Sequence, residues 1–158
     1  MAFDAFLKIE GIQGESSDKT HPGEIEIESF SWGVTNTGTG TVGGGGGAGK
    51  AVSQDFHFTT SLSKASPSLM LACATGRHFQ LATLTCRKAG GSGQVEFLKI
   101  KLIDALVSSY QTGGVTDGDA AVPTDQFSLN FAKIDFLYAV ARTGEQIETT
   151  FDFSANRT

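Results

Sequence analysis

Apolar and polar residues alternate along most of the chain, which is the pattern of β-strands that bury one face. The alternating stretches cover residues 3–9, 25–34, 52–58, 127–138 and 147–153. The phase of the alternation changes near Glu28–Ser29 and again near Ala132–Lys133, as an extra residue in a β-bulge would produce. We therefore expect many strands, two of which are re-aimed along their length.

Residues 97–110 allow two interpretations. Apolar residues at positions 98, 100 and 102 alternate as in a strand, whereas the leucines at 98, 102 and 106 also fit one face of a helix. We favour two strand pieces that are separated by a kink near Asp104.

The stretch "SPSLMLACATG", residues 66–76, predicts a helix instead of a strand. Ser66 suits the N-cap, Pro67 suits the first helical position, and Gly76 suits the stop after the last turn. We expect this helix to cover about residues 67–75. Many strands, one short helix and no linker together predict a mainly β protein, a single domain over residues 1–158, folded as a closed or sandwich-like β-barrel.

Composition and charge narrow the class of protein. Of the 158 residues, 39% are hydrophobic and 18% are charged, which is enough apolar material for a core. The net charge of −5 disfavours nucleic acid as a partner, because phosphate neutralisation requires a basic surface. No stretch approaches the ~20 apolar residues of a membrane span, and the first residues lack the features of a signal peptide. We expect a protein that is made in the cytoplasm, is not inserted in a membrane and is not exported by a cleaved signal.

The stretch "VGGGGGAGKA", residues 42–51, raises the possibility of a nucleotide site, since Gly44 to Lys50 match the phosphate-binding pattern G-x-x-x-x-G-K. That loop requires a buried strand before it and a helix after it. Here a polar stretch precedes the glycines, and an alternating strand begins at Ala51. We therefore interpret residues 36–50 as a long glycine-rich loop between two strands. A loop of this length inside a compact domain usually binds a partner.

Other candidate residues do not assemble into a reaction centre. The sequence "SLSK" (61–64) matches a serine-hydrolase motif but lacks the partner motifs of that class. The histidines at 21, 57 and 78 have no carboxylate or thiol at ligand spacing, and the glutamates at 24, 26 and 28 fit the solvent face of a strand. The two cysteines, Cys73 and Cys86, suggest neither a disulfide framework nor a zinc site. We predict no catalytic residue, no cofactor and no metal.

Several segments occur in the order in which a known family carries them. They are "GESSDKTH" (14–21), "SFSWG" (29–33), "GGGGGAGK" (43–50), "SPSLMLACATGRHF" (66–79), "LTCRKAGG" (84–91) and "VEFLKIKLIDALVSSYQTGG" (95–114). The chain resembles the haemolysin-coregulated protein (Hcp) family, the tube subunit of the bacterial type VI secretion system. The resemblance covers roughly residues 1–136. The last strand departs from it, with Thr150-Phe151-Asp152 where many members carry Gly-Trp-Asp.

This resemblance implies a two-sheet β-barrel with one helix at its side, and homohexameric rings that stack into a hollow tube. It also implies partners: sheath and spike proteins of the secretion apparatus, and small effector proteins that the tube carries and chaperones in its lumen. Such a protein is cytoplasmic before firing and secreted afterwards. A small-ligand-binding barrel of lectin or lipocalin type, without tube formation, stays open as an alternative, as does an enzyme that uses "SLSK" or the glycine tract.

Within this framework the sequence offers two groups of candidate contact residues. The glycine tract would be an extended arm that follows a neighbouring subunit, since glycine allows close backbone approach. The subunit-interface candidates are Thr39, Thr41, Val42, Gly43, Gly44, Gly45, Gly46, Gly47 and Lys50. Phe30 and Trp32 share one strand face, so Ser29 and Ser31 share the other. We expect the two serines to line the lumen and to contact effectors.

Overall fold

The computed structural model describes residues 2–38, 49–90 and 93–158. In chain order the elements are β1 (Asp4–Ile9), β2 (Ile25–Ile27), β3 (Ser29–Ser31), β4 (Val34–Asn36), β5 (Ala51–Ser53), β6 (Phe56–Ser61), α1 (Ala65–Thr75), β7 (His78–Gly90), β8 (Gly93–Gly113), β9 (Thr124–Ala139) and β10 (Gln146–Asp152). Strands dominate and α1 is the helix that the sequence predicted, so the expected mainly β class is confirmed. In the part of the chain that the structure describes, no helix is both long and apolar enough to cross a membrane.

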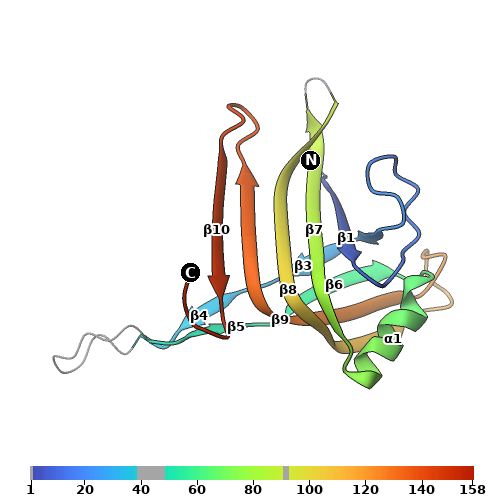
Figure 1. The fold of residues 1–158 in the computed structure, drawn as a ribbon. Coiled ribbons are helices and arrows are strands. Elements are labelled where there is room, and N and C mark those ends of the chain that lie inside the picture. Colours follow the sequence, from blue (N-terminus) through green and yellow to red (C-terminus); the bar gives the residue numbers. More distant parts are fainter. Residues whose placement is uncertain (1, 39–48, 91–92) are drawn as a thin grey trace.

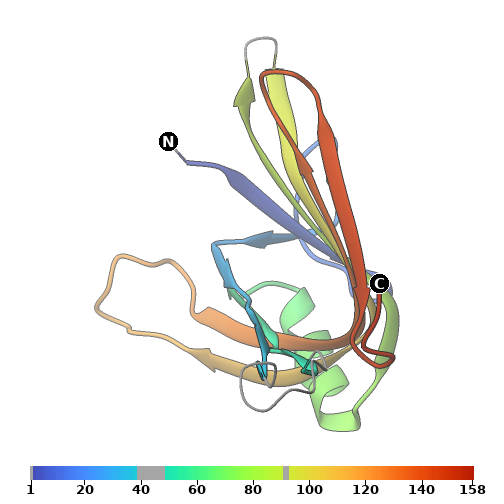
Figure 2. The ribbon, with the colours of Figure 1, turned by 90° about the vertical axis from the view of Figure 1, so that its left-hand side faces the viewer.

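The strands form one large antiparallel sheet and one small one. The large sheet has the order β2-β1-β7-β8-β9-β6-β3, and β10 pairs with β9 in addition. Its two ends nearly meet, because β2 and β3 are separated by Glu28 alone, whose N–H donates to the carbonyl of Thr59 at 2.8 Å. The sheet therefore curls into a nearly closed barrel, with α1 at its side (Figures 1 and 2). β4 and β5 pair with each other as a separate two-stranded sheet.

The expected changes of phase correspond to changes of strand direction. Glu28 divides the predicted strand into β2, which pairs with β1, and β3, which pairs with β6. The kink near Asp104 is confirmed, since this residue has a φ of 55°. The strand is nevertheless continuous: β8 runs through the kink, with Ile103 and Ala105 paired to Lys133 and Phe131. The prediction of two separate strand pieces was therefore wrong, because the pairing with β9 resumes at once on either side.

The helix begins two residues earlier than the sequence predicted. Lys64 occupies the N-cap without a side-chain hydrogen bond, and Ser66, which was expected there, lies inside the first turn. The cap is instead supplied by Ser63, whose hydroxyl accepts from the backbone N–H of Ala65 at 3.2 Å, while the hydroxyl of Ser66 accepts from the backbone N–H of Ser63 at 3.0 Å and donates to the buried carboxylate of Asp125 on β9. The end of the helix is as predicted, with Gly76 in the left-handed conformation at a φ of 66°.

The core fills the curled sheet and the space under α1. Phe56, Phe58 and Phe127 stack in sequence, with ring centroids 4.9 Å and 5.1 Å apart. Asp125 is fully buried among these apolar residues, where it accepts hydrogen bonds from Ser66 and, at 3.0 Å, from the hydroxyl of Tyr110. A buried carboxylate needs such partners, and here they fasten the first turn of α1 to the barrel wall.

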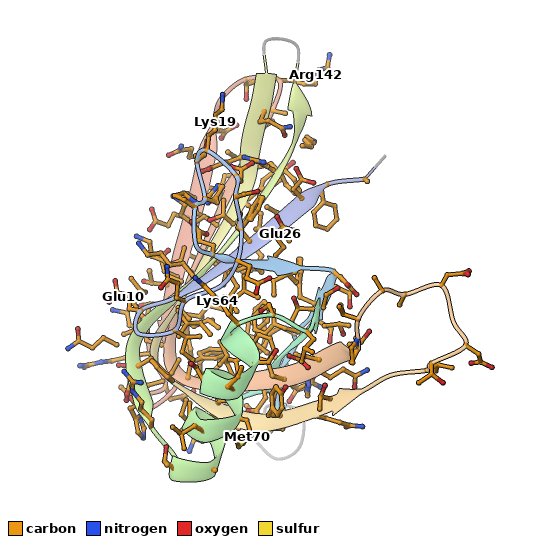
Figure 3. All side chains as sticks on the ribbon, turned by 90° about the vertical axis from the view of Figure 1, so that its right-hand side faces the viewer. Glu10, Lys19, Glu26, Lys64, Met70 and Arg142 are labelled. Atoms are coloured by element: carbon orange, nitrogen blue, oxygen red, sulfur yellow. The ribbon has the colours of Figure 1, made fainter. Side chains whose placement is uncertain are left out.

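Two adjacent helix residues give a matched test of this packing. Leu69 is fully buried, whereas Met70 is 50% exposed and points outward from α1 (Figure 3). We expect Leu69→Ala to lower the free energy of unfolding by about 2–5 kcal/mol, because it removes apolar contacts and leaves a cavity. Met70→Ala should change that free energy by about 0.5 kcal/mol or less. Urea denaturation followed by circular dichroism measures both, and equal losses would contradict the placement of the helix.

Candidate assembly surfaces

The two-stranded sheet β4–β5 forms a ribbon that projects from the barrel beside the end of β10 (Figure 1). Cross-strand pairs place Val34 opposite Ser53 and Thr35 opposite Val52. Both valines are 50% exposed, so the ribbon shows apolar surface to solvent. The predicted connection between two strands is confirmed in that residues 37–50 join β4 to β5. Of the interface candidates, Lys50 is described and is exposed.

The remaining interface candidates lie outside the described residues. They are Thr39, Thr41, Val42, Gly43, Gly44, Gly45, Gly46 and Gly47. Their assignment stays a prediction. A phosphate-binding loop requires a helix directly after its lysine, whereas here Lys50 leads into the strand β5.

An apolar cavity of about 420 Å³ lies between the ribbon and the strands β9 and β10. The apolar side chains that line it are Trp32, Val34, Ile134, Phe136, Phe151 and Phe153. Large apolar concavities that open to solvent commonly mark sites for a partner or a ligand. The ribbon and the last strand thus form one continuous candidate surface.

The serine candidates on β3 are exposed, and their aromatic neighbours face the other way. Phe30 and Trp32 pack against Phe56, with ring centroids 5.9 Å and 6.1 Å away. Ser29 and Ser31 therefore point outward, as the alternation predicted. Whether this face lines a lumen stays a prediction.

Strand pairing extends the serine face in a way that the sequence did not reveal. Ser31 is opposite His57, and His57 is opposite Ser128 on β9. The hydroxyl of Ser128 lies 2.7 Å from that of Ser108 and 2.5 Å from that of Ser109, both on β8. Hydroxyl groups thus gather on this face across β3, β9 and β8, where Ser128 itself is buried and Ser108 also donates to the carboxylate of Asp55 at 2.7 Å.

The hydrolase-like residues do not form a reactive pair. Ser61 donates its hydroxyl hydrogen bond to the carboxylate of Glu28 at 2.5 Å, and Lys64 serves as the N-cap of α1. The backbone N–H of Lys64 donates to Glu15 at 3.0 Å. Among the residues that the structure describes, no group of three or more histidine, cysteine or acidic side chains is arranged to hold a metal ion. Cys86 is buried on β7, and this burial raises the pKa of its thiol to about 12.

The loop before β2 is docked on the outer face of β1 and β7. Arg87 on β7 lies over the ring of Phe6, 4.8 Å from its centroid, and forms an ion pair with Asp18 of the loop. Hydrogen bonding from this guanidinium holds the pKa of Asp18 well below its usual range. Gly14 permits the tight fold of the loop, because an added Cβ would collide with the backbone carbonyl of Glu24.

The three histidines have separate roles in the structure. His21 is buried in this docked loop, stacked on Phe6 at 4.6 Å, with its ring nitrogens 2.9 Å from Glu24 and 2.9 Å from Glu96. His57 is exposed and faces away from its phenylalanine neighbours, as predicted. His78 is exposed beside Asp104 at 3.0 Å. The expectation of no neighbouring carboxylate was therefore wrong for His21: Glu24 is only three positions away, and Glu96, 75 positions away, left no local signal.

Two carboxylates lie side by side on β9 and β10. A hydrogen bond with Asp135, followed by its negative charge, raises the pKa of Glu148 above the ordinary value, whereas the charge of Lys101 acts in the opposite direction. Asp135 and Glu148 share one face of β9 and β10, and the cavity-lining rings of Phe136 and Phe151 lie on the other, because alternate residues of a strand point to opposite faces. The last strand therefore carries apolar groups on one face and acidic groups on the other.

The large curled sheet, its side helix and its projecting ribbon define the class of protein. The family model "Type VI secretion system effector, Hcp" matches residues 6–138, and the chain belongs to this family. It is 51% identical over 138 residues to Protein hcp1 of Pseudomonas aeruginosa, a match that covers 87% of this chain and 84% of that protein.

Solved structures of the family share the fold. The crystal structure of Hcp1 from Salmonella typhimurium superposes with a TM-score of 0.84 at 34% identity, covering 99% of each chain. A type VI secretion system effector from Yersinia pestis superposes with a TM-score of 0.77 at 28% identity, covering 94% of this chain and 99% of that one. The resemblance expected from the sequence is thereby confirmed.

The carboxylate pair gives a pH-dependent prediction. A carboxyl group whose pKa is raised in the folded state favours folding below its unfolded pKa, and this contribution is lost as the pH rises through the folded pKa. We therefore expect Glu148→Gln to raise the melting temperature at pH 7, with a smaller gain near pH 4, where the glutamate is already largely protonated. Glu145→Gln, on the adjacent turn, removes the same charge away from Asp135 and serves as the control. Thermal melts of both variants at the two pH values measure this, and a gain that does not depend on pH would contradict it.

Proposed function

We propose that this chain is the tube subunit of a type VI secretion system: it forms homohexameric rings, and the rings stack into a tube that a contracting sheath expels behind a spike. The family match over residues 6–138 carries this proposal. The protein acts as one structural domain over residues 1–158, without catalysis or a cofactor. It is cytoplasmic before firing and is secreted afterwards.

The projecting ribbon supports a role in assembly. Its half-exposed valines, Val34 and Val52, and the apolar cavity beside it are surfaces that a second copy can cover. We assign the subunit contact to the segment that the ribbon carries, including Thr39, Thr41, residues 42–47 and Lys50. Sheath and spike proteins contact the assembled tube, and small effector proteins occupy its lumen.

A small-ligand-binding barrel is the second candidate, and the volume of the cavity favours it. About 420 Å³ falls within the ~300–1,000 Å³ range of small-molecule sites. However, the barrel interior between β6 and β9 is not hollow, because the stacked rings of Phe56, Phe58 and Phe127 fill it. A chain that stays monomeric and binds a small ligand saturably would favour this candidate over the tube subunit.

The oligomeric state tests the proposed function directly. Multi-angle light scattering of the purified chain at micromolar concentration should give a mass about six times the 16.6 kDa of one chain. Negative-stain electron microscopy of the same sample should show rings with an open centre. A monomer at every concentration would exclude the tube subunit.

The serine face gives a prediction about cargo. We infer that Ser31 lines the lumen and contacts effectors, because it is exposed on a hydroxyl-rich outer face. Ser31→Gln adds a bulky polar side chain there and leaves the aromatic side of β3 unchanged. Rings should still form, but they should retain several-fold less effector in co-purification. Ser68→Gln, an exposed serine on α1, is the matched control, and equal retention by both variants would place the effector contact elsewhere.

A further inference from the structure

We propose that the turn at the end of the chain is a strut that sets the direction of the β4–β5 ribbon, and that Asn156 is the positioning residue through which this turn governs assembly. This inference rests on the proposed function for its consequence, but the strut itself is a property of the single chain. The turn is continuous with β10 and comprises residues 152–157.

Two hydrogen bonds fix the short strand β5 against the body of the protein. At one end, the indole N–H of Trp32 donates to the hydroxyl of Ser53 at 3.0 Å. At the other end, the backbone N–H of Ala51 donates to the side-chain oxygen of Asn156 at 3.1 Å. β5 is three residues long, so these bonds hold both of its ends. Two anchored ends define a direction, whereas one anchored end leaves a pivot.

The turn is rigid enough to act as a strut. The carboxylate of Asp152 accepts hydrogen bonds from the backbone N–H groups of Ser154 at 2.9 Å and Ala155 at 3.2 Å, and from the hydroxyl of Ser154 at 2.5 Å. Asp152 and Arg157 close the turn by two backbone hydrogen bonds, at 2.8 Å and 3.2 Å. The hydrogen bonds from Ser154 and Ala155 lower the pKa of Asp152, so this carboxylate stays charged well into the acid range.

The turn is also anchored to the core. The backbone N–H of Phe153 donates to the carbonyl of Ala132 on β9 at 2.8 Å. The ring of Phe153 packs against Phe131 at 5.9 Å and against Trp32 at 6.4 Å. The same Trp32 bonds to Ser53, so the strut and the other anchor of β5 meet at one aromatic cluster.

Asn156 combines the two properties that the strut requires. Its φ of 54° lies in the left-handed region, which asparagine, aspartate and glycine tolerate better than other residues. Its side chain supplies the oxygen that accepts from Ala51. Substitutions can therefore separate the conformation of the turn from the hydrogen bond to the ribbon.

The direction of the ribbon matters because residues 37–50 connect the end of β4 to the start of β5. A change of direction at Asn36 and Ala51 redirects the segment to which the proposed function assigns the subunit contact. Asn156 thus acts on that segment through β5.

Trp32 is the sole tryptophan of the chain, which makes it a specific reporter of the ribbon. It lines the apolar cavity under the ribbon and bonds to β5. Loss of the Asn156 anchor should free the outer end of β5 and admit solvent to the indole. We expect Asn156→Gly to increase acrylamide quenching of Trp32 and to reduce hydrogen-exchange protection of the Ala51 amide at least tenfold. The melting temperature should stay close to that of the parent, because the barrel core is untouched.

Assembly is then compared across matched variants. Asn156→Gly should form several-fold less ring and tube in light scattering and electron microscopy, approaching a reference that lacks residues 41–47. Asn156→Asp keeps both the left-handed conformation and an oxygen acceptor, and it should restore assembly and Trp32 protection. Ala155→Gly loosens the same turn but keeps the Asn156 bond, and it should behave as the parent. Ala51→Pro removes the donor of the same bond at the first position of β5, so it should reproduce Asn156→Gly even if that variant folds poorly.

The outcomes separate the strut from the proposed function. Unchanged Trp32 quenching and Ala51 exchange in Asn156→Gly would overturn the strut. Changed quenching and exchange with full assembly would overturn its role in assembly. A parent chain that never forms rings would remove the tube proposal, while the fluorescence and exchange measurements would still decide whether Asn156 positions the ribbon.

Discussion

The bend shared by β8 and β9 determines how the rest of the molecule is arranged. On one side of it, residues Thr124–Leu129 of β9 pair with β6 and belong to the barrel. On the other side, residues Lys133–Ala139 pair with β10 and form a wall that extends beyond the barrel. Figure 2 shows the strands turning from one direction to the other. Where β9 changes its partner from β6 to β10, the carbonyl of Ala132 accepts a hydrogen bond from the backbone N–H of Phe153. This carbonyl therefore keeps a hydrogen-bond partner through the bend.

Local chemistry holds the bend in place. Asp104 adopts a left-handed conformation that costs energy for a residue with a side chain, although aspartate tolerates it better than most. Its carboxylate lies 3.0 Å from the ring nitrogen of His78, the first residue of β7. On the side of the bend where β9 pairs with β6, stacked phenylalanines fill the barrel. Trp32 packs on both Phe56 and Phe153, so it joins the last strand to that core. The ribbon, its cavity and the strut at Asn156 all depend on this change of direction.

Local patterns in the sequence predicted the strands, the kink and the end of the helix, because these depend on neighbouring residues. Alternation placed Ser31 outside and Trp32 inside, and Gly76 marked the C-terminal stop of α1. The predicted N-cap of α1 was wrong, because Ser63 caps the first turn and Ser66 lies inside it, where it bonds to Asp125, 59 positions away. The Asn156–Ala51 bond spans 105 positions and leaves no local signal. Contacts such as these depend on how strands far apart in the sequence are placed, and the sequence therefore did not predict them.

The same limit applies to the serine face, since Ser31 and Ser128 share a face only through the pairing of β3, β6 and β9, with His57 between them. Residues 42–47 are a different case, because their glycines are plain in the sequence but their role in assembly stays a proposal. A sequence pattern can indicate that a surface is unusual. It takes the placement of the surrounding strands to say which partner chemistry the surface fits.

The charge on β10 limits which partners can pair with the edge of the sheet. Residues 146–150 are all exposed, and an exposed edge strand invites pairing with other chains. Glu148 lies on this edge strand beside Asp135 of the neighbouring strand β9, and the raised pKa of Glu148 reflects the unfavourable energy of holding both charges. A strand that approaches must therefore bring a cation or hydrogen-bond donors. In a ring of identical copies, each edge meets a different surface of the same chain. Glu148 thus disfavours partner surfaces that are themselves acidic, because like charges brought together repel.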